Sequence, residues 1–114
     1  MIKPIVMWKL KNAADAPHFK AQLDSCRQLV PGMRAFEVAI RTAGLEANCD
    51  VVLYSVFDGS AALAAYQNHP HHQHVSSGLG ALRETRTVLI TKLKETNHDP
   101  FNDIFQAPYH PATV

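Results

Sequence analysis

The fold of this chain turns on residues 66–74, which read YQNHPHHQH. Four of the seven histidines lie within six residues here, behind Tyr66 and around Pro70. Proline disfavours the α conformation in the residue before it, so His69-Pro70 predicts a break between two helical pieces. Because histidine titrates near neutral pH, this cluster could transfer protons or bind metal. It could also be solvated polar surface at a helix break.

The segments on either side of this break alternate between strand and helix patterns. Strands are predicted where β-branched and aromatic residues alternate or run together, and helices where apolar residues recur at a period near 3.6. The first helix is expected to carry an inward stripe of Phe19, Leu23, Cys26 and Val30, with Asp15 as its N-cap, and to end at Pro31-Gly32. Asp58 or Ser60 is expected to cap the second helix. The predicted elements are strands at 2–10, 33–42, 50–57 and 84–94 and helices at 15–30, 60–68 and 71–77.

The order β-α-β-β-α-β is that of the split-βαβ, ferredoxin-like fold. It predicts an α+β domain with an antiparallel sheet covered by helices on one face. The predicted strands are apolar on both faces, so a second layer must cover the other face. A second copy of the sheet would do so and give a symmetric homodimer with a barrel-like interior. We expect Val51, Leu53 and Leu89 to lie in that interface.

Composition and charge exclude several classes of protein. The 114 residues are enough for one domain, and a net charge of +1 gives no footprint for nucleic acid. The sequence shows neither an apolar run long enough for a membrane span nor a signal-peptide pattern. We therefore expect a cytoplasmic protein, no membrane partner, and two reduced cysteines, Cys26 and Cys49.

The last part of the chain differs in character from the rest. Residues 95–114 hold three prolines and several large apolar side chains but no helical or strand period. The sequence thus predicts a domain over residues 1–94 and a C-terminal tail over 95–114. We expect the tail to dock on a partner subunit or to cover the mouth of a cavity.

Four segments carry a resemblance to a known family. Residues 2–11 (IKPIVMWKLK), 30–33 (VPGM) and 50–53 (DVVL), and above all Tyr66-x-x-His69-Pro70-x-His72, resemble the stress-responsive A/B barrel (Dabb) domain. The resemblance covers about residues 1–94. It implies a dimeric α+β barrel with a cavity between the helices and the sheet. Many members have no assigned activity, and one plant member, olivetolic acid cyclase, is a cofactor-free polyketide cyclase.

The resemblance also implies roles for individual residues. Tyr66 matches the catalytic tyrosine of the cyclase and His72 its general-base histidine. Two further pocket histidines of the cyclase fall at Pro4 and Asp50 here, so the chain departs from the cyclase at both positions. Asp50 could cap the start of a strand or orient the His72 imidazole. The residues expected to contact a small apolar or aromatic ligand are Val6, Trp8, Phe19, Leu23, Phe36, Asp50, Val52, Val88 and Ile90.

Three functions fit these residues. The first is a small-molecule-binding dimer, with His72 as the general base of a lyase or cyclase and Tyr66 as an orienting group. The second is a non-catalytic binding or stress-response module, and the third is a monooxygenase-like enzyme that needs no cofactor. No cofactor fingerprint or phosphate loop is present in the sequence, so no cofactor is expected. His71 and His74 are three residues apart, yet a metal site is not predicted and His69 is expected to bond backbone at the break.

Overall fold

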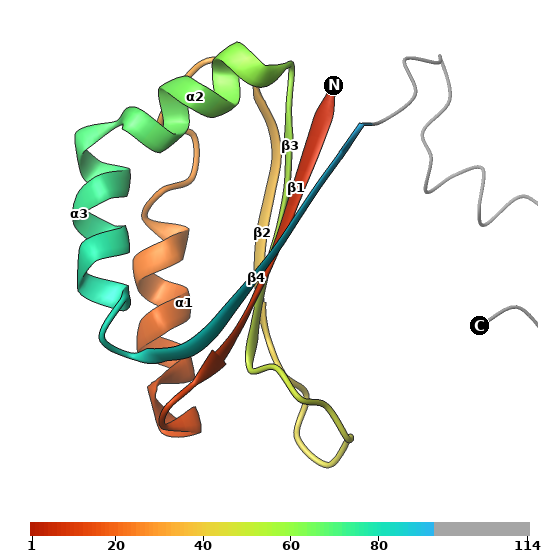
Figure 1. Cartoon of the computed structure of the whole chain (residues 1–114), viewed down its shortest axis with the longest axis vertical. Helices are drawn as coiled ribbons and strands as arrows, with labels where there is room; N and C mark the ends of the chain where they lie inside the picture. The colour runs from red at the N-terminus through yellow and green to blue at the C-terminus, as the bar shows by residue number, and fades with distance from the viewer. Residues whose placement is uncertain (93–114) are drawn as a thin grey trace, which may run out of the picture.

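A computed structural model describes residues 1–92 of the chain (Figure 1). The elements are β1 (Ile2–Leu10), a 3-10 turn η1 (Ala13–Asp15), α1 (Ala16–Asp24), β2 (Met33–Ile40), β3 (Val51–Phe57), α2 (Ser60–Asn68), α3 (Pro70–Leu79) and β4 (Arg83–Lys92). Their order confirms the predicted βαββαβ pattern, with the second helix divided in two.

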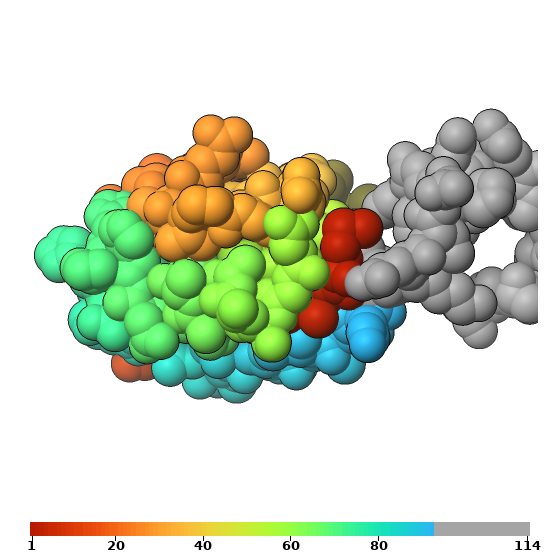
Figure 2. Space-filling view, turned by 90° about the horizontal axis from the view of Figure 1, so that it is seen from above, coloured from red at the N-terminus to blue at the C-terminus, as the bar shows by residue number. Residues whose placement is uncertain are grey.

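The four strands form one antiparallel sheet in the order β2-β3-β1-β4. Figure 2 shows this order as colours that pass from orange and gold through green and red to blue. The helices lie together on one side of the sheet (Figure 1). This is the ferredoxin-like α+β fold that the sequence predicts.

Alternate residues of the central strands build the core under the helices. Val6 and Trp8 of β1 are buried and stand opposite Leu53 and Val51 of β3. Because side chains alternate across a strand, all four point to the helix layer. The helices contribute the other half of this core, from Phe19, Leu23, Leu63, Tyr66, Val75 and Leu79.

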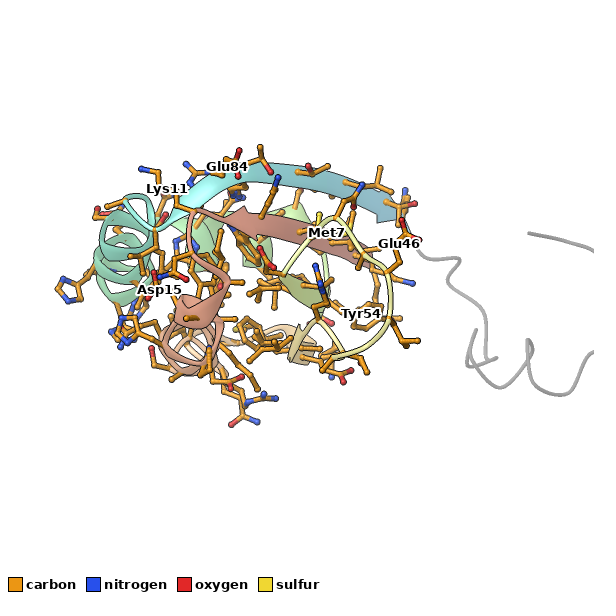
Figure 3. All side chains as sticks on the ribbon, turned by 90° about the horizontal axis from the view of Figure 1, so that it is seen from below. Met7, Lys11, Asp15, Glu46, Tyr54 and Glu84 are labelled. Carbon is orange, nitrogen blue, oxygen red and sulfur yellow. The ribbon has the colours of Figure 1, made fainter. Side chains whose placement is uncertain are left out.

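The other face of the sheet is also apolar, as predicted, but of the three residues expected there only Leu89 lies on it. Met7 lies opposite Val52, and Ile5 lies between Tyr54 and Leu89. Figure 3 shows Met7 and Tyr54 on the side away from the helices. Leu89 is 61% exposed and Met7 39%. We call Ile5, Met7, Val52, Tyr54 and Leu89 the outer face.

The expectation that Val51 and Leu53 lie with Leu89 is therefore wrong. Val51 is 2% exposed and Leu53 5%, both beneath the helices. Strand β3, which carries Val51 and Leu53, does not pair with β4, which carries Leu89, because β1 lies between them. Which residues of β3 and β4 share a face is set by the pairing of each strand with β1. The alternation within one strand does not reveal this.

The first helix is shorter than predicted. It ends at Asp24, and the buried Cys26 lies in the turns that follow. The Ser25 hydroxyl donates to the Gln22 carbonyl, and Gln28 takes a left-handed conformation (φ 59°). Asp15 occupies the N-cap position but its side chain makes no capping hydrogen bond. The helix ends early because local bonds compete with its continuation, among them those from the Cys26 and Arg27 amides to the Leu23 and Asp24 carbonyls.

The start of α2 also differs from expectation. Gly59 is the N-cap, and no side chain caps the helix. The Asp58 carboxylate instead pairs with the Arg34 guanidinium, and the Asp58 amide donates to the Gly32 carbonyl. Gly32 has φ +90°, and a Cβ there would come within 2.9 Å of the Ala62 side chain. Glycine is thus required where the loop before β2 passes α2.

The predicted break at His69-Pro70 is confirmed. α2 ends at Asn68, His69 is extended (φ −64°, ψ 133°), and α3 starts at Pro70. The His69 Nδ1 accepts a hydrogen bond of 3.1 Å from the His71 amide. His69 is therefore the side-chain cap of α3, which is the bracing role expected from the sequence.

The predicted tail and the boundary at residue 94 lie outside the described residues, so both stay predictions. Over residues 1–92 no helix is long and apolar enough to cross a membrane. The cytoplasmic location stays a prediction too.

Candidate functional site

A pocket opens between the sheet and the helices α2 and α3. It has a volume of about 100 Å³, and β1, β3 and β4 form its floor while α1, α2 and α3 close it from above. Its apolar walls are Pro4, Val6, Trp8, Leu23, Leu53, Phe57, Leu63, Val75, Leu79, Val88 and Ile90. Its polar and charged walls are Ser55, Tyr66, Gln67, His72, Ser76, Arg83 and Arg86. An apolar cavity with a few convergent polar groups is typical of a small-molecule site.

His72 lies in this pocket directly behind the helix break. Its ring packs on the Tyr66 ring, with 4.5 Å between centroids, and its Nδ1 is 3.2 Å from the Gln67 carbonyl oxygen. A carbonyl oxygen can only accept, so Nδ1 carries the proton and donates. In the neutral imidazole the lone pair is then on Nε2, the nitrogen that can act as a base.

Burial favours the neutral form of His72. It lowers the pKa of the imidazole below its ordinary value, and the positive charge of Arg86 lowers it further, while the Gln67 carbonyl acts in the opposite direction. The side chain is therefore mostly neutral at pH 7, as a general base must be.

Of the two polar residues Tyr66 and His72, Tyr66 is the more buried. Its ring is 5% exposed and contacts Phe57, with 5.3 Å between centroids. Within the described residues, its hydroxyl is the one buried side-chain polar atom without a hydrogen-bond partner. Burial, and after it the nearby Cys26 thiol, raises the pKa of Tyr66 far above its usual range. The hydroxyl thus stays protonated. The Cys26 thiol is its interacting neighbour, and no group on residues 1–92 makes a hydrogen bond of good geometry with it.

Of the nine residues expected to contact a ligand, five line this pocket: Val6, Trp8, Leu23, Val88 and Ile90. Trp8 is both core and wall, since it is 6% exposed and packs edge-on against Phe19 at 5.2 Å between centroids. Trp8 therefore belongs to the core and to the pocket wall at once.

The other four do not line the pocket. Phe19 and Phe36 are buried in the core behind its walls. Val52 belongs to the outer face, because it stands opposite Met7. Strand alternation put Val52 and Val51 on opposite sides, and only the pairing with β1 shows which side holds the pocket.

Asp50 is not beside His72. Its carboxylate accepts from the Leu10 amide at 2.8 Å, and its own amide donates to the Trp8 carbonyl at 2.8 Å. It caps backbone at the end of β1, where it extends the pairing before β3 begins. The suggestion that Asp50 orients the imidazole is therefore wrong for this structure.

Sequence reasoning missed the two arginines of the pocket, Arg83 and Arg86. Both lie on β4, where a three-residue separation would normally place them on opposite faces. The register between β1 and β4 shifts by one residue between Lys9 and Leu10. Such a bulge is invisible in a single strand pattern, which explains why Arg83 was missed. Arg86 lies on the same strand face as Val88 and Ile90, so alternation alone could have placed it in the pocket.

The other three histidines of residues 69–74 do not line this pocket. His71 Nε2 is 2.8 Å from the Ser25 hydroxyl, which ties α3 to the end of α1, and His74 is exposed. Over residues 1–92, no three His, Cys, Asp or Glu side chains come together as a metal site would require. His69, as described above, caps α3.

These features define a class of protein, a helix-covered antiparallel α+β domain with a pocket between its two layers. The sequence matches the model of the Stress responsive A/B Barrel Domain (Dabb) over residues 2–89, and the chain belongs to this family. A comparison with curated protein sequences gives no match.

Several solved structures share the fold. A dimeric ferredoxin-like protein of unknown function from Bacteroides fragilis has a TM-score of 0.69 and 23% identity, over 81% of this chain and 95% of that one. A Dabb family protein from Mesorhizobium loti has a TM-score of 0.68 and 18% identity, over 82% and 96%. SnoaB, a cofactor-independent oxygenase from Streptomyces nogalater, has a TM-score of 0.68 and 13% identity, over 86% and 97%.

Proposed function

We propose that the chain is a homodimeric A/B barrel protein that binds a small molecule beside His72 and Tyr66, with His72 as general base. One observation carries the proposal: the two side chains border one largely apolar cavity, and His72 Nδ1 donates to Gln67, which leaves Nε2 as the basic atom. The lowered pKa of His72 keeps that atom unprotonated near neutral pH.

The chemistry that this arrangement supports is removal of a proton from a weakly acidic C–H or O–H group. The proton moves to His72 Nε2, and the electron pair stays on the ligand as an enolate or alkoxide. A general base in reach of its proton contributes roughly 10²–10⁴-fold in rate. The unused Tyr66 hydroxyl is the donor proposed to orient a ligand carbonyl or to stabilise the developing oxyanion. A lyase or cyclase would use these steps.

The homodimer is proposed from the outer face. Ile5, Met7, Val52, Tyr54 and Leu89 form an apolar surface that no helix of the described chain covers (Figure 1). Large exposed apolar patches mark interfaces, and the relative from Bacteroides fragilis is described as dimeric. Two sheets packed through this face would give the barrel interior.

A second candidate is an oxygenase that needs no cofactor. SnoaB, which shares the fold, is described as such an enzyme. The same proton abstraction would produce an electron-rich carbanion or phenolate that can react with O₂. A non-catalytic binding module is the remaining alternative, in which the pocket binds ligand without turnover.

Hydrogen–deuterium exchange of a carbon acid tests the general base. We would follow loss of the α-protons of 1-tetralone in D₂O by NMR, with the wild type and with His72→Gln. The wild type should accelerate exchange over buffer, and His72→Gln should lower the protein-catalysed rate by about 10² or more. His74→Gln is the matched control, since His74 is an exposed histidine of the same helix outside the pocket.

Each outcome separates the candidates. If His72→Gln exchanges as fast as the wild type, His72 is not the base. If the wild type exchanges no faster than buffer while 1-tetralone still quenches Trp8, the non-catalytic alternative stands. Uptake of O₂ with 1-naphthol that depends on His72 would favour the oxygenase.

A further inference from the structure

The charged groups of the pocket are all of one sign. Arg83 and Arg86 line it, and within the described residues no aspartate or glutamate does. Most other walls are apolar. A ligand that fits these walls should therefore combine an apolar body with negative charge at the β4 side.

A bulge in β4 places Arg83 on the pocket side together with Arg86. Arg86 stands opposite Trp8 and therefore faces the helix layer. Lys9 is opposite Thr85 and Leu10 is opposite Arg83, so Glu84 is the extra residue. Without the bulge, Glu84 would stand opposite Leu10 and face the pocket, while Arg83 would point outward. The bulge thus exchanges a carboxylate for a guanidinium at the pocket mouth.

A salt bridge holds the displaced carboxylate outside. Glu84 Oε2 is 3.5 Å from Lys9 Nζ, and both side chains are about half exposed. Lys9 follows Trp8 in β1 and so points to the opposite face. Figure 3 shows Glu84 directed away from the interior. The acid is therefore unable to neutralise the pocket arginines.

The two arginines are without an anionic partner in the described part of the chain. Arg27 and Arg34, by contrast, pair with Asp24 and Asp58. Burial lowers the pKa of the Arg86 guanidinium, and the charge of Arg83 lowers it further. An arginine remains protonated in spite of this, so its charge is disfavoured where it stands until an anion arrives.

We propose that the pocket selects amphipathic oxyanions, with a carboxylate or similar group bound by Arg83 and Arg86 and the apolar body lying over Trp8 and Val6. This inference rests on the small-molecule pocket of the proposed function and names its ligand class. The planar guanidinium donates two parallel hydrogen bonds to a carboxylate, which an amide or an alcohol cannot match. Val88 and Ile90, beyond Arg86 on the same strand, continue the apolar wall.

A pair of isosteric probes tests the selection. Hexanoate and hexanamide have the same chain and differ in charge, and hexylamine has the opposite charge. Trp8 is the single tryptophan and lines the pocket, so its fluorescence reports occupancy. In the wild type near neutral pH, hexanoate should bind about ten-fold or more tightly than hexanamide, and hexylamine should bind weakest.

Substitutions assign the selection to the arginines. Arg86→Gln should remove most of the preference for hexanoate, about ten-fold, and leave the affinity for hexanamide within about two-fold. Arg86→Lys should keep part of it, since the charge remains but the fork geometry is lost. Lys11→Gln and Glu84→Gln change charge near the same end of β4 outside the pocket, and both should keep the preference.

The outcomes separate this inference from the proposed function. Equal affinities for hexanoate and hexanamide overturn the anion selection but leave a ligand pocket. A response of Trp8 to none of the three probes overturns both. A preference for hexanoate that Lys11→Gln reduces as much as Arg86→Gln assigns it to net charge and overturns the role of the arginines.

Discussion

His72 has a pKa below its ordinary value of 6.5, and this can be measured directly. Titration of its ring resonances by NMR should give a midpoint under 6.5. Arg86→Gln should move the midpoint upward, because the positive charge of Arg86 is one of the causes that lower the pKa of His72. The midpoint should stay below 6.5 even then, since burial is the larger cause. A midpoint at or above 6.5 in the wild type would show that the ring is solvated.

The same shift predicts how stability depends on pH. Between 6.5 and the lower pKa of the folded protein, the unfolded chain binds a proton at His72 more readily than the folded one. The free energy of unfolding should therefore fall as pH falls through this window, with no contribution from His72 above 6.5. We would measure the free energy of unfolding by urea at several pH values for the wild type and for His72→Gln. The two plots against pH should differ in slope only within this window. Parallel curves would contradict the shift.

The Tyr66 hydroxyl permits a test at a single atom. Because it is buried without a partner, Tyr66→Phe should leave the free energy of unfolding unchanged or raise it by up to about 1 kcal/mol. Ser55→Ala is the contrast, since the buried Ser55 hydroxyl donates to the Pro4 carbonyl at 3.1 Å. Its loss should cost about 1–3 kcal/mol. A large loss of stability in Tyr66→Phe would reveal a hydrogen bond that the structure does not contain.

At this scale, Tyr66 and His72, which the resemblance pairs, border one pocket. They stand six residues apart across the break, and the change of direction at His69 turns both toward one cavity. Asp50 could not be placed in this way, because its position relative to His72 depends on pairing with β1. Contacts within one local motif can be predicted, whereas contacts between strands require the register.

The joint between α2 and α3 depends on one side-chain cap. His69→Ala removes the Nδ1 acceptor of the His71 amide and should lower the free energy of unfolding by about 1 kcal/mol. His69→Asn offers another good N-cap and should restore most of it. His74→Ala is the control on the same helix, and urea unfolding measures all three. Equal stability of His69→Ala and the wild type would mean that Pro70 alone defines the joint.

Element boundaries were predictable where the backbone was constrained and not elsewhere. Pro70 fixed the start of α3, and Gly32 fixed the turn before β2. The end of α1 was missed because Cys26 continues the apolar spacing although the helix has already ended at Asp24. The spacing of apolar residues predicts which side chains face the core. Residues in a turn can keep that spacing as well as residues in a helix.

Assembly of two chains is the prediction that belongs to the whole molecule. Leu89→Asp should place a charge in the proposed interface and yield a folded monomer, because Leu89 is largely exposed in the single chain. Val51→Asp should instead unfold the chain, since Val51 is buried under the helices. Sedimentation and circular dichroism distinguish the two. A wild-type protein that sediments as a stable monomer at micromolar concentration would remove the homodimer from the proposal.

The whole fold followed from the order of elements and from apolar residues on both strand faces. The residues of each face did not follow in the same way, since Val51 and Leu53 lie under the helices while Leu89 lies on the outer face. β3 and β4 never touch, so their phases are independent until β1 is placed between them. When two strands are joined only through a third, their own sequences do not tell which of their residues share a face of the sheet.

The bulge at Glu84 has a consequence for how relatives of this chain should be compared. In an alignment, Arg83 and Glu84 occupy neighbouring columns, and the column alone does not tell which of them faces the ligand. A relative with identical residues but no bulge would present the acid to the pocket. A relative that had lost one residue at Glu84 would keep Arg83 opposite Leu10, now two residues from Arg86. Insertions and deletions in β4, more than substitutions, are therefore where a change of ligand charge should be sought.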